Sequence, residues 1–148
     1  MTVKIILVFL LVMASLKAAF AENSRLYNLE VIVNNLRSSA GVVQFALYNQ
    51  EESIPDEFFE KVSMLQKVSV LENTAKTIFV QLPAGRYAVN ILHDENNNGV
   101  IDKGLILPVE GIGFTNYDSI NIFNRPNFDD ASFLLGDDMR VQVKIIYM

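Results

Sequence analysis

The sequence contains no cysteine and no tryptophan, and its only histidine is His93. Without cysteine the chain cannot form disulfides, use a thiolate nucleophile or bind a metal through sulfur. Acidic residues outnumber the scattered lysines and arginines, giving a net charge of −5. Binding to the phosphate backbone of nucleic acid requires clustered positive charge, so no nucleic-acid partner is expected.

The longest apolar run lies at the start of the chain. Lys4 precedes the apolar segment Ile5 to Leu16, and Ala19-Phe20-Ala21 has the small-x-small pattern of a cleavage site. The run is shorter than the ~20 residues that span a bilayer, so it is typical of a signal peptide. We predict a signal peptide at residues 1–21 cleaved after Ala21, with an uncleaved anchor as the alternative because Lys17 is unusual there.

Residues 22–148 are predicted to form one periplasmic or secreted domain without a transmembrane segment. Cleavage would remove two lysines and no acid, so the net charge of −5 would become −7. A chain of this length can bury a single hydrophobic core. Because it has no disulfides, that core, or a bound ion, must supply its stability.

Short segments with alternating apolar residues dominate the predicted domain. A period of two is typical of half-buried strands, and turn residues separate the segments. An eighth strand is possible at residues 119–123, and Gly41 closes a turn that suggests pairing of the first two strands. We predict an all-β fold, an antiparallel β-sandwich with about seven strands, at residues 27–34, 43–47, 68–70, 78–82, 87–93, 130–135 and 139–147.

One short helix is expected at residues 55–62. Pro55 is followed by Asp56 and Glu57, and proline and acids favour the first turn of a helix. Phe58 or Phe59, together with Val62, would form its buried side.

The stretch from 94 to 130 is expected to be a long irregular region. It holds much of the glycine, asparagine and proline and no sustained periodicity, and such a connection is usually functional or fixed by other contacts. Glycines in Glu110–Phe114 suggest a turn anchored by Phe114, without the spacing of a phosphate-binding loop. Phe123, Phe128 and Phe133 are expected to anchor the region to the core, with a ligand-stacking face as the alternative.

The most informative motif begins the irregular region. Its oxygen-bearing residues alternate and are followed by Gly99, which is the spacing of a calcium-binding loop. Calcium requires six to eight hard oxygen ligands, and the glycine permits the sharp bend. The predicted ligands are the side chains of Asp94, Asn96, Asn98 and Asp102 and the backbone carbonyl of Val100.

The motif lacks the usual last ligand, because Leu105 occupies the position of the bidentate glutamate. Glu110, Asp129 or Asp130 could supply a carboxylate from another loop, and His93 lies beside the motif. We expect His93 to be hydrogen bonded at a strand end. The alternative is a plain turn without an ion, since Asp, Asn and Gly favour turns for local reasons.

Several motifs resemble known families. The turn Leu82-Pro83-Ala84-Gly85-Arg86-Tyr87 resembles one found in transthyretin-like exported sandwich modules. The wider pattern resembles DUF2141, a family of exported bacterial proteins of unknown function, and implies an Ig-like or transthyretin-like β-sandwich in the cell envelope. The matching segments are residues 93–102, 108–116 and 125–133; Leu105-Ile106-Leu107-Pro108 departs from the family, which often has glycine there.

No catalytic set is evident in the sequence. Serine hydrolysis needs a positioned base, and the single histidine has no evident nucleophile beside it. We therefore expect a non-enzymatic module whose 94–130 surface, ordered by Ca²⁺, binds a protein or glycan of the cell envelope. The alternatives are a metal-dependent periplasmic hydrolase using His93, Asp94 and Asp102, and an accessory module that stabilises a neighbouring protein.

Overall fold

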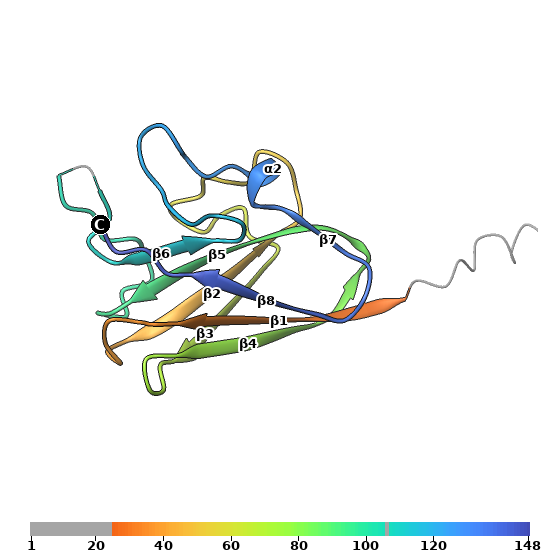
Figure 1. Ribbon diagram of the computed structural model, residues 1–148, viewed down its shortest axis with the longest axis horizontal. Helices are drawn as coiled ribbons and strands as arrows, with labels where there is room; N and C mark the ends of the chain where they lie inside the picture. Colours follow the sequence, from red (N-terminus) through yellow and green to blue (C-terminus); the bar gives the residue numbers. More distant parts are fainter. Residues whose placement is uncertain (1–24, 106) are drawn as a thin grey trace, which may run out of the picture.

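The computed structural model describes residues 25–148 except residue 106, so the predicted signal peptide lies outside the described residues. The described part is all-β, with eight strands in two sheets and one short helix (Figure 1). This confirms the predicted fold class. Over the same residues, no helix has the length and apolar character needed to cross a membrane.

The smaller sheet has the strand order β4-β1-β8. Strand β1 (Leu26–Asn34) lies at its centre, antiparallel to β4 (Ala75–Pro83) and parallel to β8 (Met139–Lys144). The parallel pair differs from the antiparallel arrangement expected throughout. Parallel neighbours need a long connection, and here most of the chain lies between the two strands.

The larger sheet has the order β3-β2-β5-β6, and β7 (Phe133–Leu135) pairs with the first residues of β5. Its other strands are β3 (Met64–Ser69), β2 (Val42–Tyr48), β5 (Gly85–Asp94) and β6 (Gly111–Phe114). The helix α2 (Phe128–Ala131) precedes β7, and the Asn127 side chain caps it by accepting a hydrogen bond from the Asp130 amide at 2.9 Å.

Two hydrophobic cores lie on opposite faces of the larger sheet. The first fills the space between the sheets and includes Leu29, Phe45 and Ile91. The second lies on the outer face, where loops 49–63 and 115–131 cover the sheet with side chains such as Phe59 and Phe128. Strands β2, β5 and β6 of the larger sheet are therefore buried on both faces, unlike those of a half-exposed antiparallel sheet, whereas the edge strand β3 is largely exposed.

Strand β4 alternates as predicted up to Val80, and the alternation then shifts by one residue. Phe79 points into the core, whereas Ile78 and Val80 are 51% and 54% exposed. Gln81 adopts a left-handed φ of 57° close to where the pairing with β1 shifts register. This irregularity returns Leu82 to the core, as expected of a bulge that changes the side on which later residues face.

The predicted pairing of the first two strands is wrong, because β1 and β2 belong to different sheets. The segment 35–41 crosses between the sheets instead of closing a hairpin. Gly41 is required there for another reason. Its φ is +66°, and a Cβ atom would collide with the backbone of Asp94 and Glu95.

The predicted helix at 55–62 is also wrong; the segment forms turns and bends. Asp56 accepts hydrogen bonds from the amides of Glu60 and Lys61, at 3.1 and 2.8 Å, and thus organises a loop. Phe59 has a left-handed φ of 55° that a helix does not allow. Phe59 is nevertheless buried, as expected, while Phe58 is exposed.

The irregular region contains more structure than its composition suggested. Residues 111–114 form β6 instead of a turn, and Phe114 is buried as predicted. Residues 119–123, all described, form no strand beyond a single bridge residue. Phe128 is buried and Phe133 is partly buried, as expected of anchors, but Phe123 is 94% exposed, which is a correction.

We expect Gly113→Ala to destabilise the fold by about 1–3 kcal/mol, the usual cost of overpacking. A Cβ atom at Gly113 would collide with the Lys144 backbone carbonyl, where β6 passes close to β8. Gly136→Ala is the matched control, because a Cβ there has no heavy atom of the described chain within 4 Å. Urea unfolding of both variants measures the difference. Equal stabilities would contradict this account of the glycine.

Candidate calcium loop and adjoining groove

Alternate residues of strand β5 face opposite sides of the larger sheet, and this places the candidate residues. Tyr87, Val89 and Ile91 belong to the core between the sheets, whereas Ala88 and Leu92 belong to the outer core. By the same alternation, His93 faces the inner side and Asp94 the outer side. The loop that follows β5 therefore begins from a buried carboxylate on the outer face of the sheet.

The Asp94 carboxylate organises the first turn of the loop. Its Oδ1 accepts a hydrogen bond from the Asn98 amide at 3.0 Å, and its Oδ2 accepts one from the Gly99 amide at 2.8 Å. The buried side chain of Gln44 donates to the same Oδ2 at 2.8 Å. Three donors thus compensate a carboxylate that has almost no access to water.

The other predicted ligand side chains converge on Asp102. Its Oδ2 accepts from Asn96 Nδ2 at 2.5 Å, and its Oδ1 accepts from Asn98 Nδ2 at 2.9 Å. The Asn96 Oδ1 in turn accepts the Asn98 amide, and Asn98 Oδ1 accepts the Val100 amide. The structure therefore brings the four side chains together, and this network is itself a set of Asx turns.

Glu110 joins the two ends of the loop. Its Oε1 accepts the Glu95 amide at 3.0 Å, and its Oε2 accepts the Asp102 amide at 3.1 Å. Burial raises the pKa of this carboxyl, and the charges of Asp102 and Asp94 raise it further, against the lowering effect of the two amides. Of the additional carboxylates predicted, Glu110 is the one that reaches the loop.

Asp129 and Asp130 lie elsewhere. Asp129 forms an ion pair with Arg86 at 2.9 Å, and Arg86 lies near the start of β5, whereas Asp94 ends it. At ~3.3 Å per residue the two ends are roughly 26 Å apart. Asp130 accepts hydrogen bonds from Asn127 and Tyr117 beside α2. The structure does not bring this pair to the loop.

His93 is fully buried and hydrogen bonded at both ring nitrogens. Nε2 lies 3.0 Å from the Ala40 carbonyl oxygen and must donate to it, because a carbonyl only accepts. In the neutral ring, Nδ1 then accepts from the Tyr147 hydroxyl at 2.7 Å. The ring links β5, the 35–41 crossing and the chain after β8, and neither nitrogen is free to act on the loop.

An ion pair flanks the loop on the side of the 35–41 crossing. Arg37 pairs with Glu95, and its guanidinium lies 4.6 Å from the centre of the Tyr147 ring. The hydrogen bond from Arg37 lowers the pKa of Glu95 more than burial raises it, and the Ser38 hydroxyl lowers it further. Both charged groups are partly exposed, so we assign this pair a positioning role, not a large stabilisation.

Throughout residues 25–105 and 107–148, no group of three or more histidine, aspartate or glutamate side chains is arranged to hold a metal ion. A cation at the loop would therefore depend on amide and backbone oxygens in addition to Asp94 and Asp102. Calcium accepts such ligands, whereas transition metals prefer imidazole or sulfur. The calcium set stays a prediction.

A groove of about 320 Å³ lies next to the loop, and the sequence did not identify it. Its apolar lining includes Ile101, which lies within the calcium motif between Val100 and Asp102, and Ile112 and Phe114 from β6. Asn90, from the middle of β5, also lines it and is only 1% exposed. The available signal in the sequence was a polar residue, Asn90, between the apolar residues Val89 and Ile91 of a strand.

A buried polar cluster lies beside Asn90. The Asp56 carboxylate accepts hydrogen bonds from two backbone amides and from the Tyr48 hydroxyl, the last at 3.3 Å. Asn90 Oδ1 is buried and has no hydrogen-bond partner in the described part of the chain, and the same is true of Gln44 Oε1.

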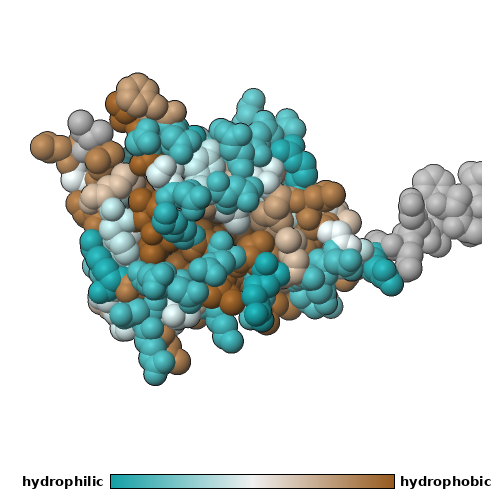
Figure 2. Space-filling view, viewed as in Figure 1, coloured by the Kyte–Doolittle hydropathy of each residue, from teal (hydrophilic) through white to brown (hydrophobic). Residues whose placement is uncertain are grey.

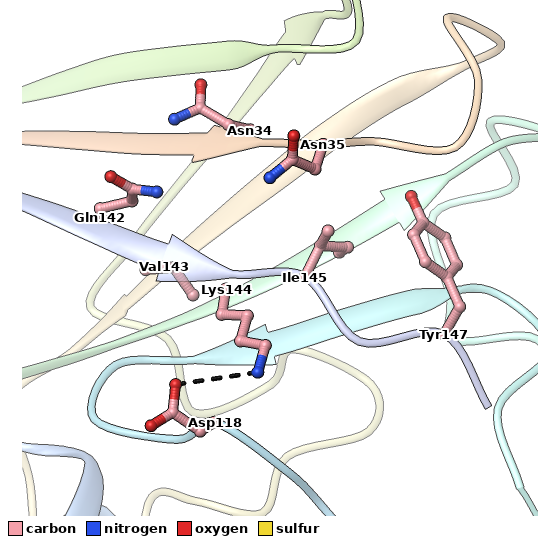
Figure 3. A pocket seen from close by; sticks show the side chains of 8 residues that line it. All are labelled: Asn34, Asn35, Asp118, Gln142, Val143, Lys144, Ile145 and Tyr147. Carbon is pink, nitrogen blue, oxygen red and sulfur yellow. Dashed lines mark ion pairs between the residues drawn. The ribbon is translucent and has the colours of Figure 1, made fainter.

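A second groove of about 520 Å³ lies where β1 and β8 end (Figure 3). It is polar, with the amide side chains of Asn34, Asn35 and Gln142 on one side. On the other side, the ammonium group of Lys144 lies 3.9 Å from the Asp118 carboxylate. Tyr147 supplies an aromatic ring, but Arg37 covers one face of that ring.

These features define a class: an all-β, two-sheet module with an acidic, amide-rich loop beside an apolar groove. The chain belongs to the family described as "Uncharacterized protein conserved in bacteria (DUF2141)", whose model matches residues 31–143. This confirms the predicted resemblance. No curated protein and no solved structure matches the chain.

We expect Tyr48→Phe to lower stability at neutral pH by about 1–2 kcal/mol and to weaken its alkaline pH dependence. Burial raises the pKa of the Tyr48 hydroxyl, and the Asp56 charge raises it further. A raised folded-state pKa gives stability that is present below the ordinary tyrosine value of about 10 and is lost as pH rises above it.

Urea unfolding between neutral pH and about pH 11 measures both effects. The other tyrosines with raised pKa values are present in both proteins, so the difference in slope reports Tyr48 alone. Identical slopes above pH ~10 would show that this hydroxyl does not titrate differently in the folded and unfolded states.

Proposed function

We propose that this protein is a non-enzymatic binding module of the bacterial cell envelope. Its loop 94–102 binds Ca²⁺ weakly and thereby orders the neighbouring groove-lining residues Lys103, Leu107 and Pro108, and the apolar groove binds a partner protein. The observation that carries the proposal is the convergence of the Asp94, Asn96, Asn98 and Asp102 side chains in one loop that leads directly into the groove.

The loop offers the chemistry that calcium requires. Two carboxylates, two amide oxygens and the Val100 carbonyl are hard oxygen ligands, and water would complete the coordination. Asp102 would exchange its hydrogen bonds from Asn96 and Asn98 for the ion. With only two carboxylates the expected dissociation constant is about 10⁻⁴–10⁻³ M, as in extracellular calcium modules.

Ordering of the loop would extend to the groove through backbone contacts. The Asp102 carbonyl accepts the Val109 amide at 2.9 Å, and the Gly104 amide donates to the Leu107 carbonyl at 2.9 Å. Ile101 packs against the outer core and also lines the groove. An ion that fixes residues 94–102 therefore also restricts one wall of the groove.

The hydrolase alternative has less support. A general base needs a nitrogen within reach of the reacting water, and both nitrogens of His93 are hydrogen bonded within the fold. We therefore infer binding as the function, with export resting on the predicted signal peptide.

A glycan partner has less support than a protein partner. Sugar sites usually combine hydrogen-bonding amides with an aromatic platform. The polar groove has the amides, but one face of its Tyr147 ring is covered by Arg37. The groove beside the loop is lined mainly by apolar side chains and suits a protein surface better.

We expect calcium to raise the melting temperature of the protein, saturably and at millimolar concentration. At a tenfold excess over the dissociation constant, the stabilisation is about 1.4 kcal/mol, or roughly 3–5 °C for a domain of this size. Asp94→Ala should abolish the shift, because it removes a central ligand. Thermal melting across a calcium titration, beside isothermal calorimetry, measures both.

Asp137→Ala is the matched control, because it removes an exposed acid from the turn between β7 and β8 and should keep the full calcium shift. Magnesium should have a much smaller effect than calcium, because it requires a tighter octahedral site. The loop would be a plain turn if the wild type does not respond. An unchanged shift in Asp94→Ala would place the ion elsewhere.

A further inference from the structure

We propose that the two loops beside the apolar groove contact the surface of a phospholipid bilayer. Leu105 and Phe123 enter the bilayer at the loop tips, and Lys103 and Arg125 bind lipid phosphate groups. This goes beyond the proposed function, which assigns the loop 94–102 and the groove, because neither Leu105 nor Phe123 lines the groove. The module then meets its partner protein at a membrane surface.

The two loops expose apolar side chains at the same end of the molecule. Of the large apolar side chains that the structure describes, Leu105 and Phe123 are the two most exposed. Leu107 of one loop and Ile122 of the other line the same groove, so the loops are neighbours. Both project at the end that carries the C-terminus (Figure 1), and Figure 2 shows apolar side chains at their tips. This apolar surface is available to a partner.

Both tips are tight turns that hold residues which turns do not favour. A backbone hydrogen bond of 2.9 Å between Gly104 and Leu107 closes the turn that contains Leu105. Two backbone hydrogen bonds, at 3.4 and 3.1 Å, enclose Phe123 in the turn 121–124. Turns favour glycine, proline, asparagine, aspartate and serine, which suit the backbone or hydrogen bond to it. The described fold therefore gives no local reason for an apolar side chain at either tip.

The two loops carry charge of the opposite sign to the chain as a whole. Residues 103–109 contain Lys103 and no acid, and residues 119–125 contain Arg125 and no acid. The whole chain has a net charge of −5. Positive charge is therefore found where the apolar tips are, two positions along the chain from each tip residue.

The two cations are placed to reach phosphate groups. Both line the groove between the loops. Arg125 has no ion pair with any residue that the structure describes, and Lys103 pairs with Glu57 at the surface, where such a pair is easily exchanged. The other acid of the groove, Asp56, already accepts three hydrogen bonds within the fold. Lysine and arginine beside an apolar anchor extend their charged ends to the phosphate layer.

The order of these groups matches a bilayer better than a protein surface. Apolar side chains stand at the tips, the cations follow, and the nearest acids in the sequence, Asp102 and Asp118, lie outside both loops. A bilayer has hydrocarbon first and a negatively charged phosphate layer next. The core of a protein interface is depleted in charge, and a protein partner would need a matching cavity for each separate tip.

The first test follows a single tryptophan, because the chain has none. It uses the mature chain, residues 22–148, which contains every described strand, since the apolar segment 5–16 would bind lipid by itself. The probe is a vesicle of phosphatidylethanolamine and phosphatidylglycerol in EDTA. We expect the emission of Phe123→Trp to shift to the blue and to be quenched by brominated acyl chains. The control is Leu134→Trp, exposed on β7 and paired near the start of β5, which should show neither effect.

The second test separates the apolar and charged contributions by vesicle sedimentation. Leu105→Ser combined with Phe123→Ser should weaken binding by about tenfold or more, because two apolar side chains no longer leave water. Arg125→Gln should weaken binding about fivefold on vesicles that contain phosphatidylglycerol, and much less on phosphatidylcholine alone. The matched control Arg140→Gln changes the net charge equally, but this arginine lies on β8 and pairs with Glu30, so binding should not change.

Several outcomes would overturn the proposal. Emission of Phe123→Trp that vesicles leave unchanged would assign the tips to a protein contact, and equal quenching of Leu134→Trp would show unspecific adsorption. Binding that survives the double serine variant would place the lipid contact elsewhere. Equal weakening by Arg125→Gln and Arg140→Gln would remove the role of Arg125.

The use of EDTA keeps this proposal separate from the calcium loop. Without free calcium, an ion cannot bridge acidic residues to the lipid phosphates. A protein that responds to calcium but does not bind vesicles would contradict the bilayer contact alone. Vesicle binding by a protein that does not respond to calcium would support the bilayer contact and contradict only the proposed calcium loop.

Discussion

Strand β5 is buried on both faces from Tyr87 to its end, and the positions of the loop and the groove follow from that constraint. Its inner face meets the smaller sheet, and its outer face is covered by loops. Polar residues on the outer face must therefore find hydrogen-bond partners within the protein. Asp94 finds three donors, whereas the Asn90 oxygen finds no partner in the described chain.

The negative charge around the end of β5 gives the loop its electrostatic character. Burial is the main cause of the raised pKa of Glu110; two backbone amides oppose it, and the charges of Asp102 and Asp94 add a smaller increase. Backbone amides thus supply much of the compensation for these carboxylates, and Arg37 pairs with Glu95 on one side of the loop.

The sequence predicts the local pattern well and the spatial connections poorly. Alternation identifies β1, β4, β5 and β8 because each has one apolar face. Alternation cannot distinguish a hairpin from a crossing between sheets, because Gly41 is compatible with both kinds of connection.

Alternation also misses β6, because Gly111 and Gly113 weaken the strand pattern. These two glycines are required by the close approach of Tyr147 and of the Lys144 backbone, which is visible only in three dimensions. The loop residues could be identified from spacing, whereas Asn90 could not, because its environment is formed by loops far away in the sequence.

The parallel pairing of β1 with β8 has a consequence for how the chain folds. Residues Leu29 to Asn34 pair with Met139 to Lys144, a separation of 110 positions, so β8 must arrive before the smaller sheet is complete. Val143 closes the inner core, and Tyr147, just beyond β8, holds His93. Contacts this distant in sequence impose a large loop-closure entropy on the folding transition state, so folding should be slow for a domain of this size. A chain lacking its last ten residues would keep most of the larger sheet. In the smaller sheet, β1 would lose β8, one of the two strands with which it pairs.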